Sequence, residues 1–488
     1  MHLTYFSPAG WETWDLGRKP LIREGTPVLI DEDLRFEDNG TPRPTIAVNR
    51  WLRELPTMGV PAAKSWKAYA QALRTWLEFL HDRQVHPFAD RQQLRAVLSA
   101  FAEYRFNGPL EVRWDGSTWN NRITIVAGFY KWALREGLCT DVPFTYAQVT
   151  HYSSTGPHET TRNLATVRRA KPHVTVKYLE ADFKDLFLRG LAGLTPDGQE
   201  DTAPDRFRGR HLGRNAAMGR LVVSSGLRAQ EFTHLLTYEI PALPARRTRV
   251  PIRWPLAKAV TKGTKPRETW IDYGALAEVY QYIDLDRDVA TYGSAYQPDS
   301  RLGDPLVVAD PHWEGAKING RTISWRRLGP IERRRLVAHD GTSPLVALQS
   351  NGEPFVDWGT VFRRTSKRIR ERFEPRFPTV TPHTLRHTFA MATMEALIKG
   401  YYQQAAQLIV DTDEDAALAL YLTKSEPILV LRDLLGHSSI ATTEVYLMRL
   451  DTQRIFREAY KQAGSRNGLL GSAARDEAAE EFDDEGGI

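Results

Sequence analysis

The sequence has 488 residues, of which 42% are hydrophobic and 26% charged, so it is long enough for two or three domains with cores of their own. A net charge of +5 and a pI near 9.1 describe a mildly basic protein. Residues 476–488 carry seven acidic residues and no lysine or arginine, so the rest of the chain carries +12, which is consistent with a polyanionic partner and also with a merely soluble basic protein. The single cysteine, Cys139, excludes intrachain disulfides and cysteine-based metal clusters, and no apolar run approaches the roughly 20 residues of a transmembrane helix. The first residues do not resemble a signal peptide, so we expect a cytoplasmic protein that does not contact a membrane.

The N-terminal part of the chain is predicted to be a helical bundle. Residues 1–43 are rich in aromatics and proline without a clear period, and no function follows from them. Within residues 44–145, three stretches carry apolar residues at helical spacing, with Ser65 and Asp90 as candidate N-caps and Gly137 as a stop. The aromatic residues of these stripes are expected to form a core.

Residues 146–175 are predicted to be a linker, because serine, threonine, glycine and proline interrupt any periodicity. Their arginines and lysine could follow a phosphate backbone or simply be solvated. From about residue 176 the chain becomes mostly helical. One helix is expected to end at Ser224. Ser225 and Gly226 would form a turn, and the next helix would begin at Leu227.

Residues 250–272 change to strand character, with two apolar runs around Lys262-Gly263-Thr264-Lys265-Pro266. Such a polar, glycine-containing stretch between two strands predicts a hairpin turn. Residues 284–342 are rich in glycine, proline and arginine. Residues 357–373 predict a basic amphipathic helix that turns Phe362, Ile369 and Phe373 inward. Its outer face carries basic residues that either contact DNA phosphates or are solvated: Arg363, Arg364, Lys367, Arg368 and Arg370.

Residues 381–447 contain the most informative pattern. Thr381 followed by Pro382 is a helix start, with a hydroxyl N-cap and proline at the first helical position. His383 and Arg386 are three residues apart and share a helical face, while an opposite face is apolar through Leu385, Phe389 and Met394.

The pattern closes with Leu434-Leu435-Gly436-His437 and with Tyr446, nine residues beyond His437. Apolar anchors are expected at Leu434, Leu435, Ile440, Val445 and Leu447. Arginine binds two phosphate oxygens at once, histidine moves protons near neutral pH, and tyrosine becomes a nucleophile when a base or cation activates it. Together these residue types indicate phosphoryl chemistry on a nucleic-acid backbone.

At these residues the chain resembles the tyrosine recombinases, the family of phage integrases and related transposon enzymes. Its His-x-x-Arg, Leu-Gly-His and late tyrosine match His383 to Arg386, Leu435 to His437, and Tyr446. The family's Gly-Leu-Arg-x-x-Glu matches Gly226 to Glu231. The resemblance therefore implies a catalytic set of six residues: Arg228, Lys262, His383, Arg386, His437 and the nucleophile Tyr446. Lys265 is the alternative to Lys262 as the catalytic lysine, and Glu231 would help to hold Arg228.

The resemblance also implies the fold: mainly α with a small β-sheet or hairpin. A helical core-binding domain (44–145) that clamps DNA, with Arg122 as a candidate contact, would precede a catalytic domain (176–462). Two stretches, 284–342 and 399–426, are longer than in compact family members, and an extra helix near 401–422 is expected in the second. The last residues, 463–488, are expected to be a disordered acidic tail.

The implied activity is site-specific breakage and rejoining of double-stranded DNA through a 3′-phosphotyrosyl bond, as in integration or transposition of a mobile element. No cofactor, metal or ATP is expected, and the active form would be a homotetramer on two DNA sites, nucleoid-associated if the source is bacterial. Two alternatives remain open at this point. One is a type IB topoisomerase that only relaxes DNA, and the other is a DNA-binding regulator that has lost catalysis.

Overall fold

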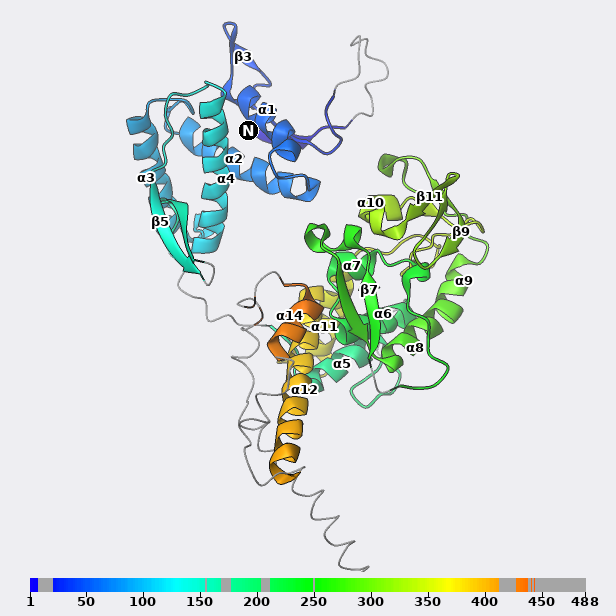
Figure 1. Cartoon of the computed structure of the whole chain (residues 1–488). Helices are drawn as coiled ribbons and strands as arrows, with labels where there is room; N and C mark the ends of the chain where they lie inside the picture. Colours follow the sequence, from blue (N-terminus) through cyan, green and yellow to red (C-terminus); the bar gives the residue numbers. More distant parts are fainter. Residues whose placement is uncertain are drawn as a thin grey trace, which may run out of the picture. The chain divides into compact units, whose positions relative to one another are not determined.

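The computed structural model describes residues 1–7, 21–153, 156–167, 177–202, 211–248, 251–411, 427–437, 440 and 443. The chain divides into two compact units, Met1–His173 and Val174–Ile488 (Figure 1). Both units are mainly helical with small sheets, which confirms the predicted fold class. Among the helices of the described residues, none is long and apolar enough to cross a membrane.

The first unit is built on four helices around one aromatic core. These are α1 (Pro44–Glu54), α2 (Ala63–His81), α3 (Arg91–Asn107) and α4 (Gly116–Arg135), with short 3-10 turns at Leu55–Thr57 and Leu110–Val112. Asp90 caps α3 by accepting a hydrogen bond from the backbone N–H of Gln93 at 3.0 Å, as predicted. The predicted cap Ser65 is wrong, because α2 already begins at Ala63. Most of the predicted core aromatics are buried, including Trp66, Trp76, Trp119 and Phe129, while Tyr69 and Tyr104 are partly buried against the same core.

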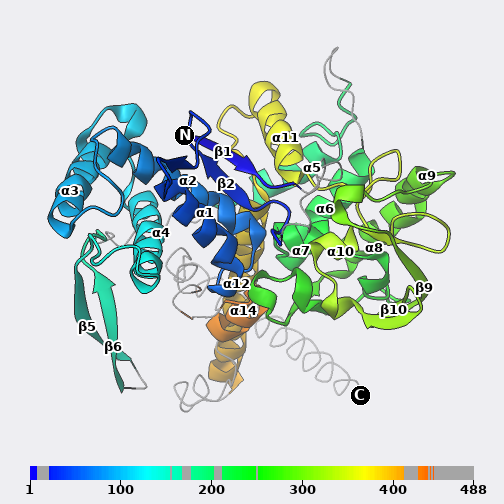
Figure 2. The same cartoon turned by 90° about the horizontal axis from the view of Figure 1, so that it is seen from above.

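Three two-stranded ribbons complete this unit, in stretches where the sequence suggested no regular structure. They pair β1 (His2–Tyr5) with β2 (Pro27–Ile30), β3 (Glu37–Asp38) with β4 (Thr41–Pro42), and β5 (Tyr146–Ser153) with β6 (Gly156–Asn163). The β5–β6 ribbon projects from the helices in Figure 2 and occupies much of the predicted linker. The linker prediction therefore fails for these residues. Polar residues with glycine and proline are as compatible with a two-stranded ribbon as with a linker.

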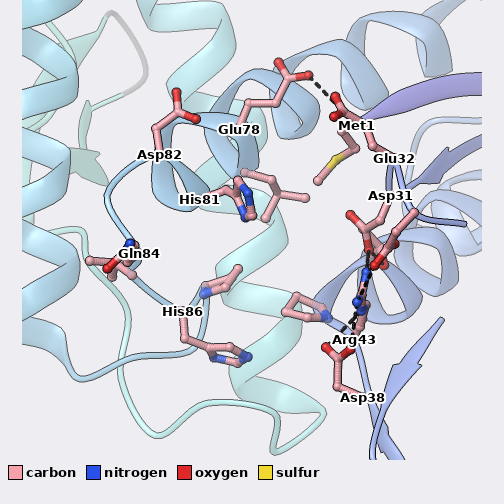
Figure 3. A pocket seen from close by; sticks show the side chains of 16 residues that line it. Met1, Asp31, Glu32, Asp38, Arg43, Glu78, His81, Asp82, Gln84 and His86 are labelled. Carbon is pink, nitrogen blue, oxygen red and sulfur yellow. Dashed lines mark hydrogen bonds and ion pairs between the residues drawn. The ribbon is translucent and has the colours of Figure 1, made fainter. Parts of the chain in front are cut away.

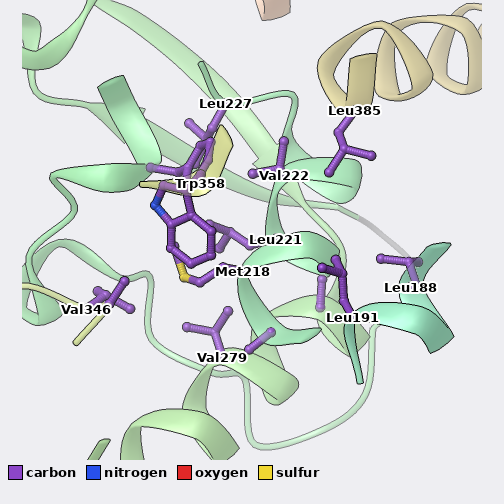
Figure 4. Packing of buried hydrophobic residues seen from close by; sticks show 14 of the residues in the cluster. Leu188, Leu191, Met218, Leu221, Val222, Leu227, Val279, Val346, Trp358 and Leu385 are labelled. Atoms are coloured by element: carbon purple, nitrogen blue, oxygen red, sulfur yellow. The ribbon is translucent and has the colours of Figure 1, made fainter. Parts of the chain in front are cut away.

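The second unit packs helices on a β-hairpin. Its helices surround a core that includes Met218, Leu221, Val222 and Trp358 (Figure 4). The main elements are α5 (Ala181–Leu191), α6 (Leu212–Ser225), α7 (Ala229–Thr233), α8 (Tyr273–Tyr282), α11 (Trp358–Arg372), α12 (Pro382–Asp411), α14 (Pro427–Leu435) and the hairpin β7 (Ile252–Leu256) with β8 (Arg267–Ile271). Shorter turns lie at Thr237–Glu239, Lys258–Val260, Lys262–Thr264 and Ile283–Arg287, followed by α9 (Asp288–Thr291).

The stretch 284–342 folds into a small sheet of its own. Its strands follow the order β11 (Arg321–Ser324), β10 (Gly315–Ile318), β9 (Leu306–His312), β12 (Leu336–Val337), and only the β9–β12 pairing is parallel. Short turns at Ser300–Leu302 and Trp325–Arg327 and the helix α10 (Pro330–Arg333) connect them. A separate apolar cluster with Trp325 at its centre holds this sheet to the turn at Leu236.

The second long stretch, 399–426, contains no separate helix within the described residues. Instead α12 continues from Pro382 to Asp411 without a break, and residues 412–426 lie outside the described part. The expected helix near 401–422 is thus, as far as described, an extension of the helix that carries His383 and Arg386. Figure 1 shows this extension running beyond α14.

Candidate functional site

Arg228 is presented at the start of the short helix α7. Gly226 ends α6 in the left-handed region, at φ +61, and a Cβ there would lie 2.2 Å from the Phe389 ring. The tight turn places Arg228 at the N-cap of α7, where its Nη1 donates to Glu231 Oε1 at 3.0 Å. The backbone N–H of Arg228 donates to the other carboxylate oxygen at 2.7 Å. Glu231 is fully buried and therefore fixes both the backbone and the guanidinium of Arg228.

Arg386 reaches the same place from α12. The Thr381 hydroxyl caps this helix by accepting from the Thr384 backbone N–H at 3.2 Å, as predicted. Arg386 is only 3% exposed, and its guanidinium donates to the carbonyl oxygens of Gly226 and Leu435. His383, one turn earlier, lies at the surface, while the predicted apolar side at Phe389 packs inward.

The third segment is the C-terminal end of α14. Leu434 and Leu435 are buried as predicted, and Gly436 ends the helix at φ +60. His437 follows, and its Nδ1 lies 3.1 Å from the Thr443 hydroxyl. Ile440, predicted to be an apolar anchor, is 38% exposed, so that prediction is wrong. The predicted anchors Val445 and Leu447 and the predicted nucleophile Tyr446 lie outside the described residues.

Lys262 lies on the segment that joins β7 to β8. The two strands pair antiparallel, with Leu256 opposite Arg267, so the predicted hairpin is present, although its connection spans 257–266. Gln230 Nε2 donates to the Val260 carbonyl at 3.1 Å and ties this connection to α7. Lys262 opens a 3-10 turn, and both Lys262 and Lys265 are exposed.

These segments border a groove of about 780 Å³. Arg228, Lys262, Lys265 and His437 line it, and Arg267 lies at its floor. Arg386 is buried beside it and is linked to Arg228 because both guanidinium groups donate to the Leu435 carbonyl. The structure thus brings together residues that are more than 200 positions apart in the sequence.

Burial, and then the nearby positive charges, lower the pKa values of His383 and His437. Burial, followed by the charges of Arg386 and Arg228, lowers the pKa of His437 to about 4. Burial, then Arg386, Arg228 and Lys262, also lowers the pKa of His383 below its ordinary value. Both imidazoles are neutral at pH 7 in the protein without DNA.

Two side chains of the site were missed by sequence reasoning. Arg267 is 8% exposed and donates to both oxygens of Glu231. Arg267, Thr269 and Ile271 are every second residue of β8 and share its buried face, and this alternation could have predicted that Arg267 is buried. Thr443 is fully buried beside His437, and no periodicity in the sequence singles it out.

The predicted DNA contacts fall into two groups. On α11, Arg363, Arg364 and Lys367 are exposed, as a contact surface requires. Arg368 and Arg370, expected on the same outer face, instead donate to the carbonyls of Gly190 and Phe377 and so hold the fold together. In the first unit, Arg122 on α4 is half-buried and its guanidinium carbon lies 5.4 Å from the Trp114 ring centre.

A larger hollow, of about 1050 Å³, lies in the first unit and is shown in Figure 3. Carboxylates dominate its lining: Asp31, Glu32, Asp33, Asp38, Glu78 and Asp82. Arg43 donates to Asp33 and Asp38, which also lowers the pKa of both carboxyl groups. Such a surface repels phosphate, so this hollow does not suit a nucleic-acid backbone.

Comparison with known proteins bears on the first unit. Residues 48–137 match the family model of the phage integrase N-terminal SAM-like domain. Residues 48–137 of the first unit are therefore similar to the N-terminal domain of phage integrases. No curated protein matches the chain.

Among solved structures, the chain is similar to XerA recombinase at 15% identity, with 86% of this chain and 98% of that chain covered and a TM-score of 0.31. It is similar to XerH site-specific recombinase bound to palindromic difH substrate, in a post-cleavage complex, at 13% identity; 82% of this chain and 80% of that chain are covered, with a TM-score of 0.42. It is also similar to the Tn1549 transposon integrase in complex with circular intermediate DNA, at 16% identity, with 73% and 80% covered and a TM-score of 0.35.

Proposed function

We propose that this chain is a site-specific DNA recombinase that breaks and rejoins double-stranded DNA through a 3′-phosphotyrosyl intermediate, without metal or ATP. The observation that carries the proposal is the groove lined by Arg228, Lys262 and His437, to which the buried Arg386 is linked through the Leu435 carbonyl that Arg228 also binds. A phosphodiester in this groove would meet concentrated positive charge that is already held in place, which is the arrangement that stabilises developing negative charge.

Each residue has a role in the proposed reaction. Arg228 holds the scissile phosphate, and the buried Arg386 adds charge and fixes the turn before His437. Tyr446 attacks phosphorus and displaces the 5′ oxygen, which takes a proton from Lys262. His383 assists the removal of the tyrosine proton.

His437 is proposed to donate a hydrogen bond to the phosphate. Because its imidazole is neutral at pH 7, only one ring nitrogen carries a proton. A Thr443 hydroxyl that donates to Nδ1 would place that proton on Nε2, the nitrogen left for the phosphate. Thr443 would thereby select the useful tautomer.

The remaining parts of the chain fit around this reaction. The helices of residues 44–145 would clamp the duplex, and the exposed basic residues of α11 would contact its phosphates. A homotetramer on two DNA sites is proposed as the active form, because exchange between two duplexes requires four cleavages.

A nicked DNA duplex carrying the chain's recombination site tests the proposal. The short strand beyond the cleavage point diffuses away, so a cleaving enzyme is trapped as a covalent adduct. Wild-type protein should form this adduct, and Tyr446→Phe should not, while both bind the duplex with similar affinity because only one hydroxyl is lost. An adduct formed by Tyr446→Phe excludes Tyr446 as the nucleophile.

The same experiment separates the alternatives. A wild-type protein that binds DNA without any adduct is a silent DNA-binding regulator. Adduct formation without strand exchange between two duplexes indicates a relaxing enzyme of the topoisomerase type. Adduct formation with exchange, and a sizing profile of four chains on two duplexes, supports the recombinase.

A further inference from the structure

Arg267 occupies a central place in the site without facing the solvent. It is the first residue of β8, and its side chain is only 4% exposed. Nε donates to Glu231 Oε1 at 3.1 Å and Nη2 donates to Glu231 Oε2 at 2.5 Å. Nη1 donates to the carbonyl of Leu434, in the last turn of α14. One guanidinium thus joins β8, α7 and α14.

Glu231 is shared between two arginines. It accepts from Arg267 on one side and from both the backbone and the side chain of Arg228 on the other. Burial alone would raise the pKa of the Glu231 carboxyl, but Arg267 and then Arg228 outweigh it, and the pKa lies below its ordinary value. The carboxylate is therefore charged, and its charge is divided between the two guanidinium groups.

The C-terminal turn of α14 is shared in the same way. Arg267 donates to the carbonyl of Leu434, and Arg386 donates to the carbonyl of Leu435. Arg228 donates to the carbonyls of Leu435 and Gly436. Arginine suits this position because the C-terminal end of a helix carries partial negative charge. The Arg267 side chain also lies directly against Gly436, since a Cβ on that glycine would be 2.8 Å from Arg267 Cδ.

We propose that Arg267 is a positioning residue for DNA cleavage, an inference that rests on the proposed function. Through Glu231 it sets the orientation of Arg228, and through Leu434 it sets the turn that carries His437. Without Arg267, Glu231 is left with Arg228 as its only cation among the contacts described above. Arg228 would then be drawn toward the carboxylate and away from the phosphate.

Arg267→Lys is the variant that tests this role. Lysine keeps the charge beside Glu231 but lacks the planar fork that reaches two carboxylate oxygens and a carbonyl together. The matched control is Arg333→Lys. Arg333 is fully buried, donates to both oxygens of Glu239, and touches neither Glu231 nor α14 in its described hydrogen bonds.

The measurement is single-turnover adduct formation on the nicked duplex at saturating DNA, below the melting temperature of every variant. We expect Arg267→Lys to slow cleavage by roughly tenfold to a hundredfold, as small misplacements of reacting groups do, while its Kd for DNA stays near that of the wild type. Arg333→Lys should retain a rate within about twofold of the wild type, because its described hydrogen bonds reach α7 only at the carbonyl of His234 and none reaches Arg228, Glu231 or α14.

A second substrate separates positioning from general loss of structure. In it, a neutral methyl group replaces one non-bridging oxygen of the scissile phosphate, tested as both stereoisomers. An arginine that acts on the charge of that oxygen matters less once the charge is gone. The loss caused by Arg267→Lys should therefore shrink on the isomer that also reduces the loss caused by Arg228→Lys.

Three outcomes are distinguishable. If wild-type protein forms no adduct, the proposed function itself fails. If wild type is active and Arg267→Lys cleaves as fast as Arg333→Lys, the positioning role is refuted. If Arg267→Lys is slow by the same factor on charged and neutral phosphates, its effect is on folding rather than on Arg228, and the inference is again overturned.

Discussion

Lys262 is predicted to be the general acid that protonates the departing 5′ oxygen, and Lys262→Ala tests this. The Lys262 side chain is exposed on the β7–β8 connection, so its truncation should cost little stability. Its positive charge also contributes to the lowered pKa of His383. General acid catalysis contributes about 10²–10⁴-fold. At about 1.36 kcal/mol per tenfold, the expected rise of the cleavage barrier is roughly 3–5 kcal/mol.

The rate loss alone does not identify proton transfer, because Lys262→Ala also removes a positive charge. A substrate with sulfur in place of the bridging 5′ oxygen distinguishes the two effects, since a thiolate leaves without a proton. On that substrate Lys262→Ala should recover most of its lost rate, and Arg386→Ala should not. The measurement is the rate of adduct formation on oxygen and sulfur substrates.

Lys265→Ala is the control, since Lys265 lines the same groove three residues further along. The backbone carbonyl of Lys265 accepts from the Thr261 hydroxyl at 2.6 Å, so the main chain there is held whatever the side chain is. If sulfur rescues Lys265→Ala and leaves Lys262→Ala slow, the assignment of the general acid is refuted and passes to Lys265.

Further predictions concern backbone strain at Gly436, the acidic residues 476–488 and stability at low pH. Gly436→Ala places a Cβ in left-handed backbone against Arg267, and should lower the free energy of unfolding in urea by about 1–2 kcal/mol or more; an unchanged midpoint contradicts this. Deleting residues 476–488 removes seven acidic residues that repel the DNA backbone, so it should raise the non-specific affinity for DNA. The slope of log K against log salt should remain about −0.9 for each phosphate contact. His387 and His437 have pKa values lowered to about 4, so the unfolded chain binds more protons below pH 6.5, and stability should fall as the pH drops from 6.5 toward 4.

The sequence was most informative where local rules decide the structure. A hydroxyl before proline starts α12, and a glycine before a histidine ends α14, because capping and backbone sterics act over a few residues. The motif residues Arg228 and His437 could therefore be named with their elements. The Arg228–Glu231 contact followed from a separation of three positions.

What the sequence did not reveal depends on long-range pairing. Arg267 follows directly after the polar stretch 262–266, and no motif in the sequence singled it out. Its function in the fold appears only when β8 lies beside α7 and α14, which brings it to Glu231, 36 positions earlier, and to Leu434, 167 positions later. For the same reason Arg368 was misassigned to an outer face, because its carbonyl partner Gly190 lies 178 positions earlier. Arg370, also misassigned, donates to the carbonyl of Phe377, which follows the end of α11.

The charge balance of the groove leads to a last prediction, proton uptake on DNA binding. Burial, then Arg386 and Arg228, holds the pKa of His437 at about 4, and a bound phosphate would oppose the two arginine charges. An opposite charge raises a histidine pKa by about 1–3 units; with a rise of about two, the protonated fraction at pH 5.5 would go from about 3% to about three-quarters.

Calorimetry in buffers with different ionisation enthalpies measures this uptake directly. DNA also buries the imidazole further, which lowers its pKa, so the sign of the proton transfer decides whether a phosphate lies beside His437. Uptake by the wild type that is largely lost in His437→Gln supports that placement. Proton release, or uptake that His437→Gln leaves unchanged, would mean that the phosphate binds elsewhere in the groove and that His437 has no direct part in holding it.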